Sequence, residues 1–119
     1  MAEDKMATQE ISDGSYSAIR NKDTNEVTIR GTLRLNGTAE YAPIMALLEE
    51  ALSAGMVTVD LRGLQFLNSS GIAFLMRFAV KVREAKGSLR LRGSKKIPWH
   101  SKSLQNLQRI VPEIRVDLE

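Results

Sequence analysis

The hydrophobic pattern changes its period within residues 56–85, and this change constrains the fold more than any other feature of the chain. Residues 56–61 form a short apolar run rich in β-branched side chains, which is typical of a buried strand, here ending near Arg62. From Ile72 onward, apolar residues recur at i, i+3, i+4 and i+7, which predicts a helix with one buried face. The apolar positions of this helix are Ile72, Leu75, Met76, Ala79 and Val82. Between strand and helix stands Asn-Ser-Ser-Gly at residues 68–71, whose side chains are suited to cap the first turn of a helix.

The remainder of the chain extends this unit into a larger α/β domain. Residues 16–20 and 26–35 predict two antiparallel strands joined by a polar turn, because apolar and polar side chains alternate in the second of them. Further elements are expected as a helix at residues 39–53, a strand at 88–92, a helix at 101–110 and a closing strand at 114–118. This order predicts one α/β domain over residues 13–119, with a mixed sheet of four or five strands and helices packed mainly on one face. Residues 1–12 are polar without a period and are predicted to form a flexible tail.

The side chains that a catalytic or metal site needs are sparse in this sequence. His100 is the only histidine and there is no cysteine, so the common zinc sites cannot be built. No glycine-rich segment has the spacing of a phosphate-binding loop. Ser69 has no proton acceptor near it in sequence, and Asp60 is a lone carboxylate expected to serve as a turn acceptor. The chain is therefore predicted not to be an enzyme and to need no metal.

Charge is divided unevenly along the chain. Residues 1–60 carry a formal net charge of −5 and residues 61–119 carry +8. A basic half can bind nucleic acid, and this remains an alternative function. It has few aromatic side chains, however, since Trp99 is the only one after Phe78, so we expect a solvated basic surface without specific nucleic-acid binding. With no apolar run of membrane-spanning length and no signal peptide, the protein is predicted to be cytoplasmic and not membrane-bound.

One stretch of the sequence resembles a known family. The strand ending Val-Asp-Leu, the following Leu-x-Phe-Leu-Asn-Ser-Ser-Gly-Ile and the aliphatic helix resemble the signature of STAS domains, the family of anti-sigma-factor antagonists and related partner-switching proteins. The resemblance covers about residues 57–82. The family's usual motif is Asp-Ser-Ser-Gly or Asp-Ser-Thr-Gly. Its phosphorylated residue falls on Ser69, whereas its acidic residue falls on Asn68, where this chain departs from the pattern.

The resemblance implies a STAS-like fold and a non-catalytic, phosphorylation-controlled switch of the anti-sigma-factor-antagonist type. Such a protein binds a serine kinase/anti-sigma factor of the histidine-kinase-like ATPase fold while Ser69 is free, and releases it when Ser69 carries phosphate. A PPM-type serine phosphatase resets the switch. ATP in such a system belongs to the kinase, so this chain needs no cofactor of its own. The residues expected to bind the partner are Asn68, Ser69, Ser70, Gly71, Ile72 and Phe74.

The physical chemistry of a helix start suits Ser69 as a phosphate acceptor. A phosphate adds a charge of roughly −1.5 to −2, which the exposed N–H groups and the macrodipole at a helix N-terminus tolerate. Phosphorylation should therefore leave the fold intact and act on a docked partner. Two alternatives to the switch remain open: residues 68–71 serve only as a helix cap, or Asn68 marks a STAS scaffold without a phosphoswitch. For Phe74, either burial in the core or a place in a partner-binding patch remains open. We expect Ser70, one step further along, to be the helix cap.

Overall fold

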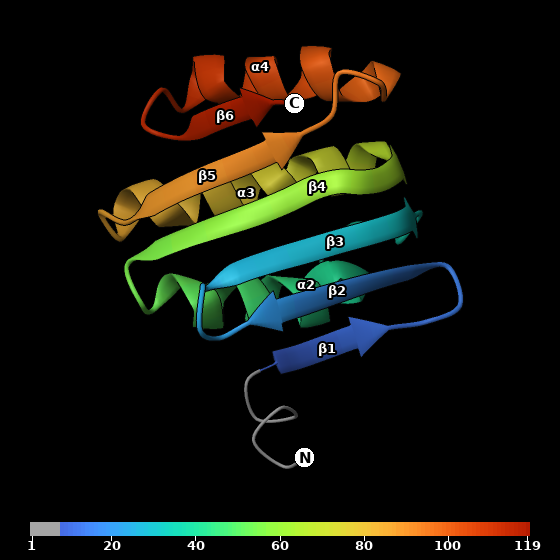
Figure 1. The fold of residues 1–119 in the computed structure, drawn as a ribbon, viewed down its shortest axis with the longest axis horizontal. Coiled ribbons are helices and arrows are strands. Elements are labelled where there is room, and N and C mark those ends of the chain that lie inside the picture. Colours follow the sequence, from blue (N-terminus) through green and yellow to red (C-terminus); the bar gives the residue numbers. More distant parts are fainter. Residues whose placement is uncertain (1–7) are drawn as a thin grey trace.

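The computed structural model describes residues 8–119 as strands and helices in regular alternation after an initial run of strands. In chain order the elements are β1 (Thr8–Ser12), β2 (Tyr16–Asn21), β3 (Glu26–Leu33), α2 (Gly37–Leu52), β4 (Met56–Leu67), α3 (Ser69–Glu84), β5 (Ser88–Gly93), α4 (Pro98–Ile110) and β6 (Arg115–Leu118). The strands form one six-stranded sheet in the order β1-β2-β3-β4-β5-β6. The first three strands pair antiparallel and the last four pair parallel. Figure 1 shows α2 and α3 behind the sheet and α4 beside β6, which confirms the predicted mixed sheet with helices on one face.

The sheet has one strand more than predicted, because β1 falls in the segment predicted to be a flexible tail. That prediction is wrong for residues 8–12, which pair with β2 from Thr8 opposite Asn21 to Ser12 opposite Ser17; residues 1–7 lie outside the described part of the chain. Polar contacts help to hold β1 in place: the Arg20 Nη1 donates to Gln9 Oε1 at 2.8 Å. A strand attached in this way has no alternation of apolar residues by which the sequence could reveal it.

Strand β4 runs past the point at which the sequence pattern ends. It spans twelve residues, from Met56 to Leu67, instead of ending near Arg62. Two register shifts against β3 each place one extra residue in β4, first opposite Thr28 to Arg30 and then between Leu64 and Phe66. Such bulges break the strict alternation of buried and exposed side chains, which is why the pattern stops early. Because β4 continues, it leads directly into the Asn-Ser-Ser-Gly segment at the end of the sheet.

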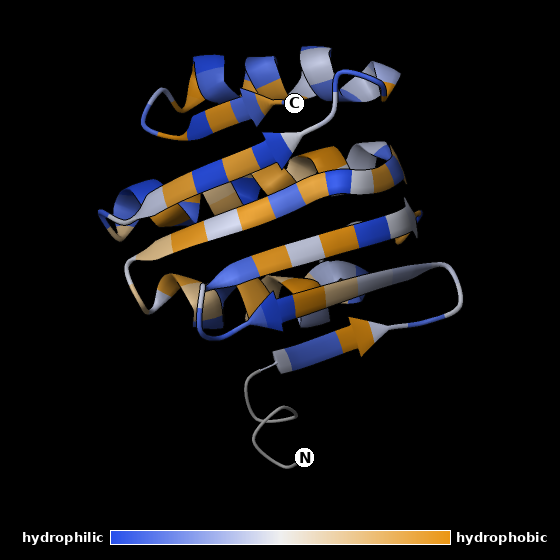
Figure 2. Ribbon diagram, viewed as in Figure 1, coloured by the Kyte–Doolittle hydropathy of each residue, from blue (hydrophilic) through white to orange (hydrophobic). Residues whose placement is uncertain are grey.

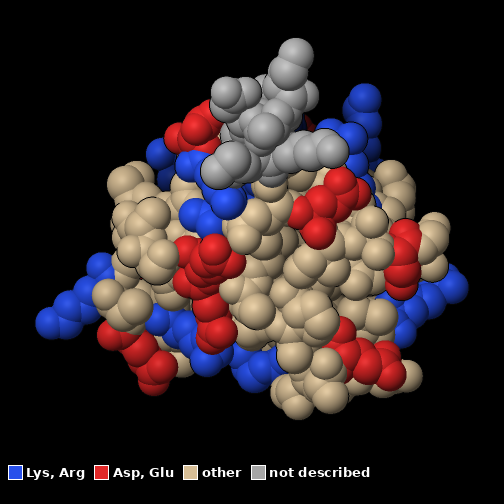
Figure 3. Space-filling view, turned by 90° about the horizontal axis from the view of Figure 1, so that it is seen from below, with Lys and Arg blue, Asp and Glu red and all other residues tan. Residues whose placement is uncertain are grey.

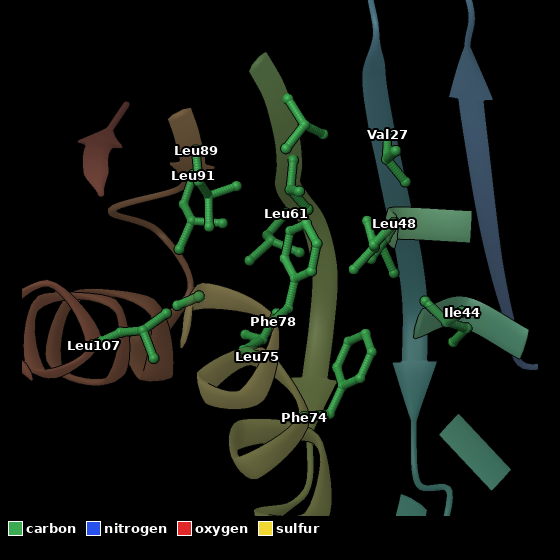
Figure 4. Close-up of a cluster of buried hydrophobic side chains, with 14 of the residues drawn as sticks. Val27, Ile44, Leu48, Leu61, Phe74, Leu75, Phe78, Leu89, Leu91 and Leu107 are labelled. Atoms are coloured by element: carbon green, nitrogen blue, oxygen red, sulfur yellow. The ribbon is translucent and has the colours of Figure 1, made fainter. Parts of the chain in front are cut away.

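The core lies between the sheet and the helices. Figure 2 shows apolar and polar residues alternating along the strands, and Figure 4 shows the apolar side chains meeting those of the helices. Members of this cluster include Val27, Ile44, Leu48, Leu61, Phe74, Leu75, Phe78, Leu89, Leu91 and Leu107, all buried. The ring of Tyr41 in α2 stacks on that of Phe74 in α3, with centroids 5.0 Å apart, so the two helices share one aromatic contact beneath the sheet. Burial of each such side chain stabilises the fold by roughly 1.5–3 kcal/mol.

The opposite face of the sheet is open and carries charged side chains that pair between strands. Arg92 of β5 bonds Glu26 of β3 at 3.0 Å and Glu119, just after β6, at 2.9 Å. Arg62 of β4 joins the same group through Glu119 at 3.1 Å. These pairs are partly solvated, so each contributes little to stability on its own. Some of the cations in the basic second half of the chain are therefore paired with carboxylates at the surface.

His100 is fully buried at the start of α4, where it links the β5–α4 loop to β4. Its Nδ1 accepts a hydrogen bond from the Ser94 N–H at 2.8 Å, and its Nε2 lies 3.0 Å from the carbonyl oxygen of Leu64. The two contacts fix a neutral ring with the proton on Nε2, which donates to Leu64. Burial lowers the pKa of His100 below its ordinary value, and the weaker opposing effect is the bond to Leu64.

We expect acid to destabilise the protein through His100 before its carboxylates titrate. With a lowered pKa in the folded state, the histidine binds a proton more readily when unfolded, so the stability is present above the unfolded value of about 6.5 and is lost as the pH falls below it. The loss should reach at most about 1.4 kcal/mol for each pH unit. Denaturant titrations between about pH 7 and pH 5 measure it. His100→Gln, which cannot titrate, should show a flatter profile; an equally steep one would contradict the assignment.

Candidate phosphorylation and partner-binding site

Asn68 is the N-cap of α3, and its side chain ties the start of this helix to two other elements. Its backbone is extended, with φ −79° and ψ 176°, and its Oδ1 accepts a hydrogen bond from the Gly71 N–H at 2.9 Å. The same oxygen accepts a bond from the Tyr41 hydroxyl of α2 at 2.8 Å. The Asn68 Nδ2 donates to the carbonyl oxygen of Leu35, just after β3, at 2.8 Å. One amide therefore satisfies a first-turn N–H group of α3 and fixes α2 and the end of β3 around it.

The Tyr41 hydroxyl stays protonated and so remains a hydrogen-bond donor to Asn68. The side chain is fully buried, and burial raises the pKa of Tyr41 above its ordinary value, an effect that outweighs the hydrogen bond at Leu35. The phenol consequently keeps its proton throughout the physiological pH range. Tyr41 thus contributes both a hydrogen bond to Asn68 and its ring contact with Phe74, and it positions the start of α3 from within the core.

The prediction that Ser70 caps the helix is wrong. A cap stands before the first helical residue and has an extended backbone, and Asn68 meets both conditions, whereas Ser70 is the second residue of α3. The Ser70 Oγ instead accepts a bond from the Gly37 N–H at the start of α2, at 3.4 Å. Ser70 is half-buried, so its hydroxyl faces the neighbouring helix start.

Ser69 is the exposed member of the serine pair. It is the first residue of α3, and its side chain makes no hydrogen bond to any other residue within 8–119. The two hydroxyls therefore differ in their surroundings: that of Ser69 is exposed to solvent, and that of Ser70 contacts Gly37.

The other residues predicted to bind a partner are divided between surface and core. Phe74 is 1% exposed and stacks on Tyr41, so it belongs to the core and not to an exposed patch, in agreement with the buried-helix alternative. Gly71 is also buried, because a Cβ there would lie 2.1 Å from Leu67 Cδ1 and 2.6 Å from the Tyr41 hydroxyl. Ile72 is half-buried. Within the predicted set, Asn68 and Gly71 build the helix start, and Ser69 is the side chain that it displays.

The sequence analysis missed an exposed aromatic side chain close to this site. Phe66, near the end of β4, is 40% exposed, and the guanidinium carbon of Arg34 lies 4.8 Å from the centroid of its ring. On the other side of the strand end, Trp99 Nε1 donates to the carbonyl oxygen of Gln65 at 3.1 Å. Phe66 appears in the sequence as one more apolar residue of a buried run. Only the bulge in β4 turns its side chain outward, and a sequence pattern does not reveal such a bulge.

Asp60 is bound in an ion pair and is not poised as a general base. Its carboxylate accepts from the Arg62 backbone N–H at 3.0 Å and from the Arg62 guanidinium at 2.8 Å. Burial alone would raise the pKa of Asp60, but the hydrogen bonds and the charge of Arg62 hold it below its usual range. The expectation of a turn acceptor is wrong, because β4 continues to Leu67 and Asp60 pairs with Arg62 inside the strand. In residues 8–119, no cluster of His, Cys, Asp or Glu has the arrangement to hold a metal ion, and no helix has the length and apolarity to span a membrane.

Comparison with known proteins agrees with the fold. The chain is similar to solved structures of SiaC from Pseudomonas aeruginosa: apo-SiaC superposes with a TM-score of 0.71 at 12% identity, covering 96% of this chain and 99% of that chain. SiaC in complex with the diguanylate cyclase SiaD, which it activates, gives a TM-score of 0.68 at 14% identity over 93% of this chain and 99% of the other. At these identities the likeness concerns the fold. A search among curated proteins finds no match by sequence.

A family model described as "Mlab, STAS domain" matches residues 19–117, which include every element from β3 to α4 and the serine pair at the start of α3. The match spans most of the chain, and the six-stranded sheet with its helices has the arrangement of the SiaC structures. The chain belongs to the STAS domain family.

Proposed function

We propose that this protein is a non-catalytic binding switch in which phosphorylation of Ser69 controls association with a partner protein. The observation that supports this most is the exposed Ser69 hydroxyl at the first position of α3, on a helix start held by Asn68. Unphosphorylated protein binds a serine kinase/anti-sigma factor of the histidine-kinase-like ATPase fold, and phosphorylated protein releases it. A PPM-type serine phosphatase restores the binding form. Because the kinase consumes ATP, we assign the switch to the cytoplasm.

The mechanism follows from where the phosphate would lie. At the first position of α3, a phosphate adds roughly −1.5 to −2 of charge beside first-turn N–H groups that favour an anion. The bonds of Asn68 to Gly71 and Tyr41 do not involve Ser69, so modification leaves them in place. The added charge instead faces the docked partner, which must either lose contact with it or desolvate a dianion.

A second candidate function keeps the switch and changes the class of partner. The structural neighbour SiaC activates the diguanylate cyclase SiaD in a complex, so a STAS fold of this shape can regulate an enzyme directly. The same site would then release or activate a signalling enzyme instead of an anti-sigma factor. A third candidate is a constitutive scaffold without a phosphoswitch. It is suggested by Asn68, which carries no charge and stands where the family usually has an acidic residue. Against it, the amide oxygen of Asn68 caps α3 through the Gly71 N–H, so a carboxylate is not needed to form this helix start.

Substitutions of Ser69 test the switch. Ser69→Ala should stay folded, resist phosphorylation and bind the partner permanently. Ser69→Glu should also stay folded, because a carboxylate suits a helix N-terminus, yet bind at least tenfold more weakly, which corresponds to about 1.4 kcal/mol. The partner is identified by capture from the native cell with Ser69→Ala as bait, and its affinity for each variant is measured by calorimetry. Thermal melts show whether each variant is folded.

Ser88→Glu is a matched control, because it adds the same charge at an exposed serine at the other end of the sheet. It should bind as the parent does. Mass spectrometry after incubation with the captured kinase and ATP locates the phosphate. Phosphate on Ser70, or unchanged partner binding by Ser69→Glu, would contradict the assignment of Ser69 as the switch. Capture of a cyclase without kinase activity would favour the second candidate.

A further inference from the structure

A pocket lies at the end of the sheet opposite Ser69, where β4, β5 and β6 begin (Figure 1). The strand register explains the hollow: Met56 pairs with Ser88 and Thr58 pairs with Arg90, so short side chains alternate with long ones. Its volume is about 400 Å³, which lies within the size range of small-molecule sites. We call it the amino-end pocket, and the side chains that matter most in it are Met56, Thr58, Ser88, Arg90, Glu113 and Arg115.

Two arginines stand side by side in the amino-end pocket. Arg90 and Arg115 are paired in the β5–β6 ladder, so their like charges repel each other. The carboxylate of Asp117 reduces this repulsion, because it accepts a hydrogen bond from the Nε of each arginine. Neither guanidinium forms a further hydrogen bond among residues 8–119, so the Nη groups of both can bind a second carboxylate.

The amino-end pocket also carries a negative charge, that of Glu113 in the segment between α4 and β6. Glu113 is exposed, and its carboxylate forms no ion pair within the described part of the chain. The two guanidiniums, Asp117 and Glu113 together have no net charge, but positive and negative groups stand at different places. Charges of both signs are also interspersed on the β1 side of the molecule (Figure 3). A ligand suited to the pocket is therefore neutral overall and carries one charge of each sign.

The remaining part of the amino-end pocket is apolar. Met56 is 71% exposed, which makes it the most exposed large hydrophobic side chain among residues 8–119. Val57 and Leu89, whose side chains reach the core, line the same pocket. An apolar group of a ligand that covered Met56 would remove hydrophobic surface from water. The ligand therefore needs an apolar group in addition to its two charges.

We infer that the amino-end pocket binds a free α-amino acid with an apolar side chain. The carboxylate of the amino acid pairs with Arg90 and Arg115, whose planar guanidiniums suit a carboxylate. Its ammonium group pairs with Glu113, and its side chain packs on Met56. The hydroxyls of Thr58 and Ser88 offer further hydrogen bonds within the pocket. This site uses no residue of the start of α3 and goes beyond the proposed switch.

The test uses L-methionine as the probe, titrated into the isotope-labelled full chain while amide shifts are followed by NMR. We expect saturable shifts at the starts of β4 and β5, with a dissociation constant of about 1 mM or lower. Three analogues each remove one feature: N-acetyl-L-methionine lacks the ammonium group, L-methioninamide lacks the carboxylate, and glycine lacks the apolar side chain. Each analogue should bind at least about tenfold more weakly than methionine, because each leaves one part of the pocket without a partner.

Substitutions in the pocket give a second, independent readout. Glu113→Gln and Arg115→Gln each remove one charge from an exposed side chain, so both variants should stay folded and bind methionine at least about tenfold more weakly. Arg34→Gln is the matched control, because it removes an exposed arginine just after β3, at the opposite end of the sheet. It should bind methionine as the parent does.

Several results would overturn the amino-acid site. They are shifts that map elsewhere, the lack of saturable binding, equal binding of any of the three analogues, and an unaffected Glu113→Gln or Arg115→Gln variant. Equal binding of N-acetyl-L-methionine in particular would mean a simple anion site at the arginines. Ser69→Ala should bind methionine as the parent does, so the amino-acid site and the proposed switch stand or fall separately.

Discussion

Gly71→Ala should lower the free energy of unfolding by about 3 kcal/mol, a large loss for a single methyl group. A Cβ at this position would lie 2.1 Å from Leu67 Cδ1 and 2.6 Å from both Leu67 Cγ and the Tyr41 hydroxyl. Neither neighbour can move away freely. Leu67 is buried at the end of β4, and Tyr41 is held by its bond to Asn68 and its stack on Phe74. The variant must therefore shift α3 away from α2 or lose the cap.

Urea titrations of the variant and the parent measure this loss. Gly14→Ala is the matched control, because a Cβ at Gly14 meets nothing within 4 Å. Its stability should stay within about 0.5 kcal/mol of the parent, as for most surface substitutions. A Gly71→Ala variant as stable as the Gly14→Ala control would mean that the close approach of the two helices is not needed for folding. The glycine of the serine motif would then require another explanation.

Asn68→Ala should cost a similar amount, about 3 kcal/mol, because one side chain satisfies three groups. Loss of an N-cap bond alone costs about 1 kcal/mol. The Tyr41 hydroxyl and the Leu35 carbonyl would also lose their partners, and each part-buried group left unsatisfied adds about 1 kcal/mol or more. Ser70→Ala, which removes only the long contact to Gly37, should cost far less. Equal losses for the two variants, measured by urea titration, would contradict the assignment of the cap.

Asn68→Asp restores the residue type that is usual in the family and separates the acceptor from the donor role. The carboxylate keeps an oxygen for Gly71 and Tyr41, but its second oxygen faces the Leu35 carbonyl at the position where Nδ2 now donates. The new carboxyl group must be protonated to donate there. The variant should therefore be less stable than the parent at pH 7, and the difference should shrink as the pH is lowered toward about 4. A difference independent of pH would show that the loop at Leu35 rearranges.

The pattern of apolar residues predicted the fold well wherever burial follows a regular period. The strand at 56–61, the helix after Asn68 and the antiparallel pair of β2 and β3 have such periods, and the structure confirms them. Strand β1 and the second half of β4 do not, because polar contacts hold the one and bulges interrupt the other. In both cases a tertiary contact, not a local preference, decides the conformation.

The start of the helix after the serine motif was predicted, but the contacts around it were not. The motif located the helix start and the serine pair, because strand, polar segment and helix follow one another in sequence. Which residue caps α3 depends on Tyr41 and Leu35, which lie 27 and 33 residues away along the chain. Likewise, the inward direction of Phe74 is set by its stack on Tyr41, and the outward direction of Phe66 by a bulge. A single sequence contains no information about such distant partners until the fold brings them together.

The three bonds of Asn68 also bear on what the kinase proposed to modify Ser69 would have to recognise. They come from α2, α3 and the end of β3, so the helix start cannot open without separating elements that pack in the core. We expect these bonds to suppress local fraying of this turn, so that the backbone around Ser69 stays helical until much of the domain unfolds. An enzyme that reads an extended peptide would find no such segment here. The proposed phosphorylation of Ser69 would therefore need the folded domain as its substrate, and we expect a peptide with the same sequence not to be phosphorylated.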